Sequence, residues 1–171
     1  MKKLSLILFS LSILFFTNYS QTEEKLIYGK AKVIDGDTIK INGKNIRLQG
    51  IDAPEMKQSC KDQNNSSYAC GQVSKNFLEG LIKYTMETQS LKKVYCYYSE
   101  IDRYKRILGE CFVGSQKKNN LNKMMVISGN AVAYLRYSHK YAKEAAKAKL
   151  EKKGIWSGKF MTPENWRRKN K

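Results

Sequence analysis

The sequence contains one histidine, His139, and no Cys-x-x-Cys pair. Zinc sites draw on closely spaced cysteines and histidines, so this scarcity argues against a zinc-binding domain. The sequence also has no internal repeat and no linker-like run that would separate two domains. These absences favour a single domain of roughly 150 residues, which is enough for one hydrophobic core.

Acidic residues are scarce in comparison with basic ones. The chain has 15 Asp and Glu residues against 32 Lys and Arg residues, which gives a formal net charge of +17. The basic residues are spread along the chain and are densest at the C-terminus. Such an excess favours salt-sensitive binding to a phosphate backbone. Adhesion to acidic polymers of the cell envelope is an alternative that charge alone does not distinguish.

The long apolar run of the sequence lies at the N-terminus. Lys2 and Lys3 precede Leu4–Phe16, and a polar stretch, residues 17–21, follows. The run is too short to cross a bilayer as a helix, and this order of segments is typical of a secretory signal peptide. We expect residues 1–21 to be removed, leaving a bacterial secreted or periplasmic protein without stable membrane association. An uncleaved membrane anchor is the alternative.

All four cysteines lie beyond this segment. An even number of cysteines in an exported chain indicates disulfide bonds, and four cysteines allow three pairings. Cys60 and Cys70 flank a polar loop, whereas Cys96 and Cys111 stand almost symmetrically about the connection between two expected strands. We therefore predict the pairs Cys60–Cys70 and Cys96–Cys111.

The hydrophobic pattern predicts a small barrel. Apolar residues predict strands over 30–34, 38–41, 45–50, 94–98 and 107–113, with turn signals at Asp35-Gly36-Asp37 and Asn42-Gly43. Helical spacing predicts helices over 71–84, around 121–125 and over 142–150. This order favours a mainly β, α+β fold: a five-stranded Greek-key barrel of the OB type with three helices. We expect the domain to span 22–158 and a basic tail without regular structure to span 159–171.

Two short runs concentrate acidic residues in this basic chain. Asp35-Gly36-Asp37-Thr38 and Arg47–Glu55 bring several carboxylates and an arginine together in the sequence. Ca²⁺ prefers carboxylate and carbonyl oxygens, so the runs indicate a hard-cation site suited to phosphodiester chemistry. A third run, Asp102–Arg106, offers a second arginine. The alternatives without a metal site are a turn stabilised by Asp35 and the ordinary end of a strand at 52–55.

The three runs together resemble a known family. Asp-Gly-Asp-Thr, Arg-x-x-x-x-Asp-x-Pro-Glu and Asp-Arg-Tyr-x-Arg, with Gly-Ile-Trp-Ser at 154–157, resemble the motifs of the staphylococcal nuclease (thermonuclease-like) family. The resemblance covers roughly Tyr28 to Ser157. It implies a five-stranded OB barrel with three helices and Ca²⁺-dependent cleavage of DNA and RNA to 3′-phosphate products. The two cysteine pairs make the chain most similar to members exported by Gram-negative bacteria.

Carried over position by position, the resemblance implies a calcium site. Asp37 and Asp52 match the family's calcium carboxylates, and Ala53 sits where a main-chain carbonyl also binds the metal. Glu55 matches the glutamate that holds or activates the attacking water. Ala53 stands where the best-known member has threonine, a change of little consequence if only the main-chain oxygen is used.

The resemblance also implies substrate contacts. Arg47 and Arg106 match the two arginines on the scissile phosphate, so these two residues and Glu55 form the expected catalytic set. Arg103 and Tyr104, which precede Arg106, are candidate substrate contacts. Tyr137 is a third candidate, because it falls where the family places a nucleotide-contacting tyrosine.

Two further positions depart from the family pattern. Lys105 replaces a common glycine before the second arginine, and Leu135 stands where another substrate tyrosine is expected. We therefore expect the local turn, and the stacking of bases, to differ from those of the best-known member.

These observations predict a secreted or periplasmic, Ca²⁺-dependent nuclease that acts as a monomer on single-stranded or locally melted DNA and RNA. The alternative from a different class is a non-catalytic nucleic-acid-binding OB-fold module. A polycation that binds the cell envelope without any enzymatic activity is a third hypothesis.

Overall fold

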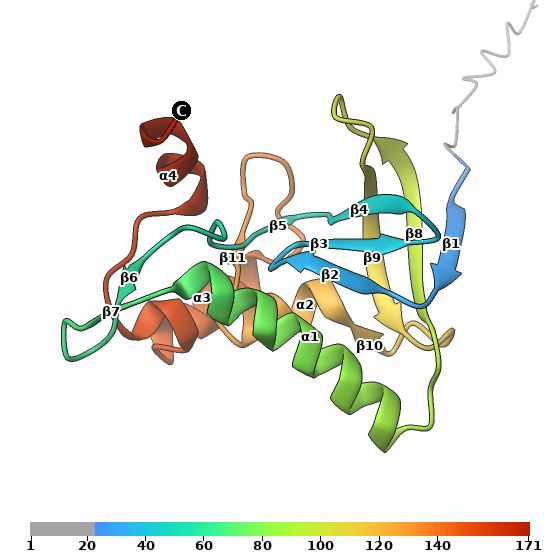
Figure 1. The fold of residues 1–171 in the computed structure, drawn as a ribbon, viewed down its shortest axis with the longest axis horizontal. Coiled ribbons are helices and arrows are strands. Elements are labelled where there is room, and N and C mark those ends of the chain that lie inside the picture. The colour runs from blue at the N-terminus through green and yellow to red at the C-terminus, as the bar shows by residue number, and fades with distance from the viewer. Residues whose placement is uncertain (1–22) are drawn as a thin grey trace, which may run out of the picture.

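Figure 1 shows the computed structural model of the protein, which describes residues 23–171; the expected signal peptide, residues 1–21, lies outside them. The strands are β1 (Lys25–Gly29), β2 (Lys32–Asp35), β3 (Thr38–Ile41), β4 (Lys44–Leu48), β5 (Ile51–Asp52), β6 (Cys60–Lys61), β7 (Ser67–Tyr68), β8 (Val94–Ile101), β9 (Ile107–Val113), β10 (Asn119–Asn120) and β11 (Val132–Ala133). The helices are α1 (Cys70–Thr88), α2 (Leu121–Ile127), α3 (Ala142–Leu150), the 3₁₀ helix η1 (Gly154–Ser157) and α4 (Pro163–Lys169).

The main sheet has seven strands. Six of them run in the order β1-β8-β9-β4-β3-β2. Strand β10 pairs with Phe112 and Val113 of β9, beyond the part of β9 that pairs with β4. The pairs are antiparallel except β4 with β9, which is parallel and joins the two halves of the sheet. In Figure 1, β2, β3 and β4 run across the view whereas β1, β8 and β9 run up it, so the sheet curls. This arrangement confirms the predicted α+β fold of the OB type.

One hydrophobic core fills the inside of the curled sheet. Side chains alternate along a strand, so Ile39 and Ile41 of β3 both point inward and are fully buried. Helices α1 and α2 cover this face with Leu78 and Met125, which are also fully buried. Within residues 23–171, no helix is both long enough and apolar enough to span a bilayer.

Two disulfides link elements around the core. Cys96 and Cys111 are direct partners in the register of β8 and β9, and they form one bond. Cys60 of β6 and Cys70, the first residue of α1, form the other. These are the pairs that the sequence predicts, because both pairs close short loops whose ends the fold brings together.

The structure adds elements that the sequence analysis does not contain. Strand β1 pairs with β8 along its whole length, from Lys25–Tyr98 to Gly29–Val94. The short strands β6 and β7 lie inside the loop expected near 57–68. The expectation of a tail without regular structure is wrong for residues 163–169, which form α4.

Local sequence explains why α4 forms. Thr162 caps the helix, since its side chain accepts a hydrogen bond from the main-chain N–H of Asn165, and Pro163 occupies the first turn. Threonine at the N-cap followed by proline is a strong helix-start signal. The segment before α4 is also anchored, because the amide of Gln58 donates to the carbonyl of Met161 at 2.7 Å.

Glu110 of β9 fixes the long loop between β11 and α3 to the sheet. Its carboxylate accepts hydrogen bonds from Asn120, Lys140 and the Tyr141 hydroxyl, each at 2.7 Å. Burial alone would raise the pKa of Glu110, but the three donors outweigh it and hold the pKa below its ordinary value of 4.5.

Candidate active site

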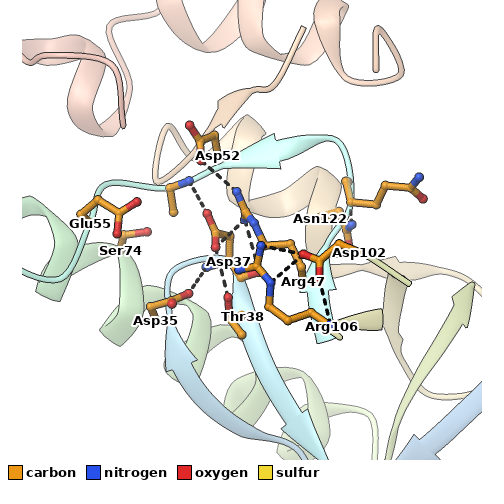
Figure 2. Close-up of polar contacts among 12 residues, drawn as sticks. Asp35, Asp37, Thr38, Arg47, Asp52, Glu55, Ser74, Asp102, Arg106 and Asn122 are labelled. Carbon is orange, nitrogen blue, oxygen red and sulfur yellow. Dashed lines mark hydrogen bonds and ion pairs between the residues drawn. The ribbon is translucent and has the colours of Figure 1, made fainter. Parts of the chain in front are cut away.

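The site is assembled from the β2–β3 turn, β4 and β5. Asp37 lies in the turn, Arg47 lies on β4 directly opposite Thr38 of β3, and Asp52 ends β5. Figure 2 shows these side chains converging on one another. The acidic runs that are separate in the sequence therefore meet in one place.

Gly36 allows the β2–β3 turn to approach its neighbours closely. A Cβ atom at this position would lie 2.1 Å from the Ser74 Oγ of α1 and 2.7 Å from the Cβ of Ala53. Real Cβ atoms do not come so near, so a side chain here would push the turn away from α1 and from Ala53. Glycine therefore sets the position of Asp37.

Arg47 lies between two carboxylates. Its guanidinium forms an ion pair with Asp37, and its Nη2 lies 2.8 Å from Oδ1 of Asp52. The other carboxylate oxygen of Asp37 accepts the main-chain N–H of Ala53 at 2.6 Å. The side chains of Arg47 and Asp52 are 11% and 1% exposed, so these are buried, charge-assisted contacts.

The buried charges perturb one another. Burial, together with the negative charge of Asp37, raises the pKa of Asp35 to about 6. Burial also raises the pKa of Asp52, against the opposing effects of Arg167 and Arg47. For Arg47, burial favours the neutral form, but the carboxylates of Asp37 and Asp52 outweigh it and raise the pKa. Such perturbed, partnered groups are typical of functional sites.

Glu55 follows β5 and joins the cluster through a third arginine, Arg167 of α4. Nη1 of Arg167 lies 2.7 Å from Oε1 of Glu55 and 2.9 Å from Oδ1 of Asp52, while Nη2 lies 2.9 Å from Oδ2 of Asp52. The Glu55 main chain is held close to α1, since a Cβ on Gly71 would lie 1.9 Å from the Glu55 carbonyl oxygen. Burial alone would lower the pKa of Arg167, but its bonds to Asp52 and Glu55 raise it.

Arg106 lies on the same side of the sheet as Arg47. The parallel register pairs Arg47 with Leu108, and residues two apart on a strand share a face, so Arg106 points to the side of Arg47. Nη2 of its guanidinium lies 2.8 Å from Oδ2 of Asp102, and its Nε also donates to Oδ2 (Figure 2). The main-chain N–H groups of Tyr104 and Arg106 donate to the other Asp102 oxygen. Burial would raise the pKa of Asp102, but hydrogen bonds from Arg106 lower it.

The remaining predicted substrate residues are exposed. Tyr104 is 65% and Tyr137 is 71% exposed. The Arg103 guanidinium lies 4.9 Å from the centre of the Tyr104 ring, and Arg106 lies 5.5 Å from it. Among residues 23–171, no hydrogen bond, ion pair or ring contact joins Arg103, Tyr104 or Tyr137 to Asp37, Asp52 or Glu55.

Comparison with known proteins matches residues 45–158 to the family of staphylococcal nuclease homologues. The chain belongs to this family. It is 35% identical over 147 residues to a succinoglycan biosynthesis protein, ExoI, of Rhizobium meliloti (85% of this chain, 72% of the relative). It is 32% identical over 174 residues to an uncharacterized endonuclease of Haemophilus influenzae (97% and 86%) and 29% identical over 134 residues to the probable endonuclease LCL3 of Komagataella phaffii (72% and 54%).

The oxygen donors of this nuclease-family site suit a hard cation. Asp37 and Asp52 share one guanidinium, and the main chain of Ala53 adjoins both. In residues 23–171 no group of three or more His, Cys, Asp or Glu side chains is placed to hold a metal ion. The carboxylates of Asp37 and Asp52 are the side-chain oxygens here that could hold a hard cation such as Ca²⁺, which would need further ligands from the main chain or from water.

Sequence reasoning missed Arg167. The family match ends at residue 158, before α4, and the C-terminal basic residues look alike in the sequence. The helix-start signal Thr162-Pro163 was available and would have placed Trp166 and Arg167 on a helix rather than in a tail. Nothing in the sequence indicates that this helix reaches the carboxylates.

Proposed function

We propose that this protein is a Ca²⁺-dependent nuclease that hydrolyses phosphodiester bonds of DNA and RNA to 3′-phosphate products. The observation that carries the proposal is the convergence of Asp37, Arg47 and Asp52 in one buried cluster with Glu55 beside it. A cluster of acids within a chain of net charge +17 is not needed to bind a polyanion, but it is needed for metal-assisted hydrolysis.

Asp37, Asp52 and the Ala53 carbonyl would hold the calcium ion. When bound, Ca²⁺ neutralises a phosphate oxygen and orients the reacting groups. The metal-ligand role is assigned to the two aspartates because both carboxylates are already oriented by Arg47 and, for Asp37, by the Ala53 main chain.

Glu55 is the proposed acceptor of the proton from the attacking water. Its side chain is 35% exposed, so water reaches it, and its Oε1 is fixed by Arg167 while Oε2 receives no hydrogen bond from a described residue. Attack of the water on phosphorus breaks the bond to the 5′-oxygen, which leaves the phosphate on the 3′ side. Glu55 takes the water proton at Oε2, and a solvent water protonates the departing 5′-oxygen.

Arg47 and Arg106 are the proposed phosphate-binding pair. A guanidinium can donate two parallel hydrogen bonds to a phosphate, and these strengthen as charge develops in the transition state. Arg106 is held toward the site by Asp102, whereas Arg47 must release a carboxylate to reach the phosphate. Arg103, Tyr104 and Tyr137 are proposed to contact neighbouring parts of a single-stranded or locally melted substrate.

The proposed location is the bacterial periplasm or the exterior of the cell, with the protein acting as a monomer. Two disulfides are typical of proteins from oxidising compartments, which supports export. The spread-out basic charge supports salt-sensitive binding of nucleic acid.

The test is cleavage of plasmid DNA and of RNA by the purified protein, with Ca²⁺ and then with excess chelator. Asp52→Asn removes a buried site carboxylate, and Asp62→Asn is the matched control because Asp62 caps an exposed loop turn. We expect cleavage that needs Ca²⁺ and that is lost in Asp52→Asn alone. Full activity in chelator would refute the metal assignment, and binding without cleavage would favour a non-catalytic module.

A further inference from the structure

Helix α4 delivers Arg167 into the carboxylate cluster. Three hydrogen bonds of 2.7 to 2.9 Å join its guanidinium to Asp52 and Glu55, across 115 and 112 residues of sequence. Both nitrogens face Asp52, which is the two-pronged geometry that arginine forms with a carboxylate. One nitrogen also reaches Glu55, so a single side chain bridges the two residues.

The helix that carries Arg167 is docked onto the domain. Gln58, itself 1% exposed, donates to the Met161 carbonyl at 2.7 Å, and Arg136 lies 2.9 Å from Glu164 in the first turn of α4. Pro163 is buried. In Figure 1, α4 stands beside the β5 and β11 end of the fold. Helix α4, which carries Arg167, is therefore anchored to the rest of the domain.

The hydrogen bonds leave the reactive positions open. A carboxylate has about four acceptor sites. Asp52 uses two on Oδ1, for Arg47 and Arg167, and one on Oδ2, for Arg167. One acceptor site on Oδ2 of Asp52 remains unused, and Oε2 of Glu55 receives no hydrogen bond from a described residue. Arg167 thus holds both carboxylates while each keeps acceptor capacity for the proposed chemistry.

Arg167 matters most when Arg47 turns to the substrate. In the described chain, Arg47 and Arg167 are the cations in contact with Asp52, whose side chain is 1% exposed. A buried carboxylate without a partner is strongly destabilised, so transfer of Arg47 to a phosphate leaves Arg167 to stabilise Asp52.

We propose that Arg167 is a positioning residue of the active site, which holds Asp52 and Glu55 in their working orientation through α4. The inference rests on the proposed function and extends the site beyond residue 158, where the family match ends. Hydrogen-bond partners of metal-ligating carboxylates typically contribute 10–100-fold to metal affinity or activity.

The experiment compares Arg167→Gln with Arg168→Gln, which removes the same charge from the next, exposed position of α4. Steady-state cleavage of a short single-stranded DNA at saturating Ca²⁺ gives kcat and KM. We expect kcat of Arg167→Gln to fall about 10–100-fold, with KM no higher than in Arg168→Gln. Arg167→Lys keeps the charge but not the fork, and its kcat should lie between those of wild type and Arg167→Gln.

Calorimetric titration of each variant with CaCl₂, without DNA, is the second readout, and thermal unfolding verifies that each is folded. We expect Ca²⁺ to bind Arg167→Gln no more tightly than wild type. Tighter Ca²⁺ binding with faster cleavage would overturn the inference, because Arg167 would then compete with the cation. A raised KM with unchanged kcat would show that Arg167 contacts the DNA instead. Wild-type values of both kcat and KM would show that Arg167 has no role in the active site. Failure of wild type itself to cleave would refute the proposed function first.

Discussion

Replacement of Arg47 by lysine keeps the charge of the cluster and removes the fork. The Arg47 guanidinium reaches Asp37 with one nitrogen and Asp52 with the other. A lysine ammonium is a compact charge on a flexible stem, so it cannot hold both carboxylates in the same geometry. The variant therefore separates the need for a planar donor from the need for a positive charge.

Two magnitudes follow for Arg47→Lys. Loss of one hydrogen bond between charged groups costs about 1.5–3 kcal/mol, and the site is buried enough for little water to replace it. We therefore expect the free energy of unfolding to fall by that amount. Loss of one preorganised donor to the transition state typically costs ~10²–10³ in rate, so cleavage should fall by that factor or more.

The assay pairs urea unfolding with cleavage of a short DNA at saturating Ca²⁺. Arg103→Lys is the comparison variant, because Arg103 is exposed and, within residues 23–171, its guanidinium makes its polar and ring contacts with Tyr104 alone. We expect Arg103→Lys to lose far less activity than Arg47→Lys. Equal losses would refute the reasoning, since they would mean that general basicity, not fork geometry, supports cleavage.

Three further predictions concern stability. Removing the Cys96–Cys111 bond by a double alanine substitution should lower the free energy of unfolding by about 3 kcal/mol in the chain-entropy model; an unchanged urea midpoint would contradict this. Glu110→Gln should lower it by about 1–3 kcal/mol at pH 7. The pKa of Glu110 is held below 4.5 in the folded state, so this stabilisation is present above pH 4.5 and disappears as the pH falls further. The difference in urea midpoint between Glu110→Gln and wild type should therefore be smaller at pH 3 than at pH 7. An equal difference at both pH values would argue against the hydrogen-bond network. Gly36→Ala should lower the free energy of unfolding by about 1–3 kcal/mol through the clash with Ser74. An unchanged thermal unfolding midpoint would show instead that α1 moves aside without cost.

Much of the fold follows from local sequence. The alternation Ile39, Ile41 and the turn at Asn42-Gly43 encode a hairpin whose register the structure preserves. Strand β1 was harder to anticipate, because Lys25–Gly29 is largely exposed and its pairing with β8 depends on a partner nearly seventy residues away. Long-range pairing of this kind leaves no local periodic signal.

The candidate site was predictable to the extent that its chemistry is local. Asp37, Asp52 and Glu55 stand in short motifs, and the curl of the sheet brings those motifs together around Arg47. Arg167 was not predictable, because its role depends on where α4 docks. That docking depends on contacts such as Gln58 to Met161, which the order of residues does not express.

Separation of binding from chemistry at Glu55 tests the central claim most directly. Glu55→Gln keeps an acceptor oxygen for Arg167 but removes the base, so the geometry of the site is preserved. The measurement is binding of this variant to short single-stranded DNA across a salt series, together with cleavage by the same sample. We expect affinity that is unchanged or slightly tighter and that falls steeply with salt, while cleavage drops by ~10²-fold or more. Cleavage near the wild-type rate would contradict the account, because Glu55 would then be a bystander in a site that lacks its proposed base.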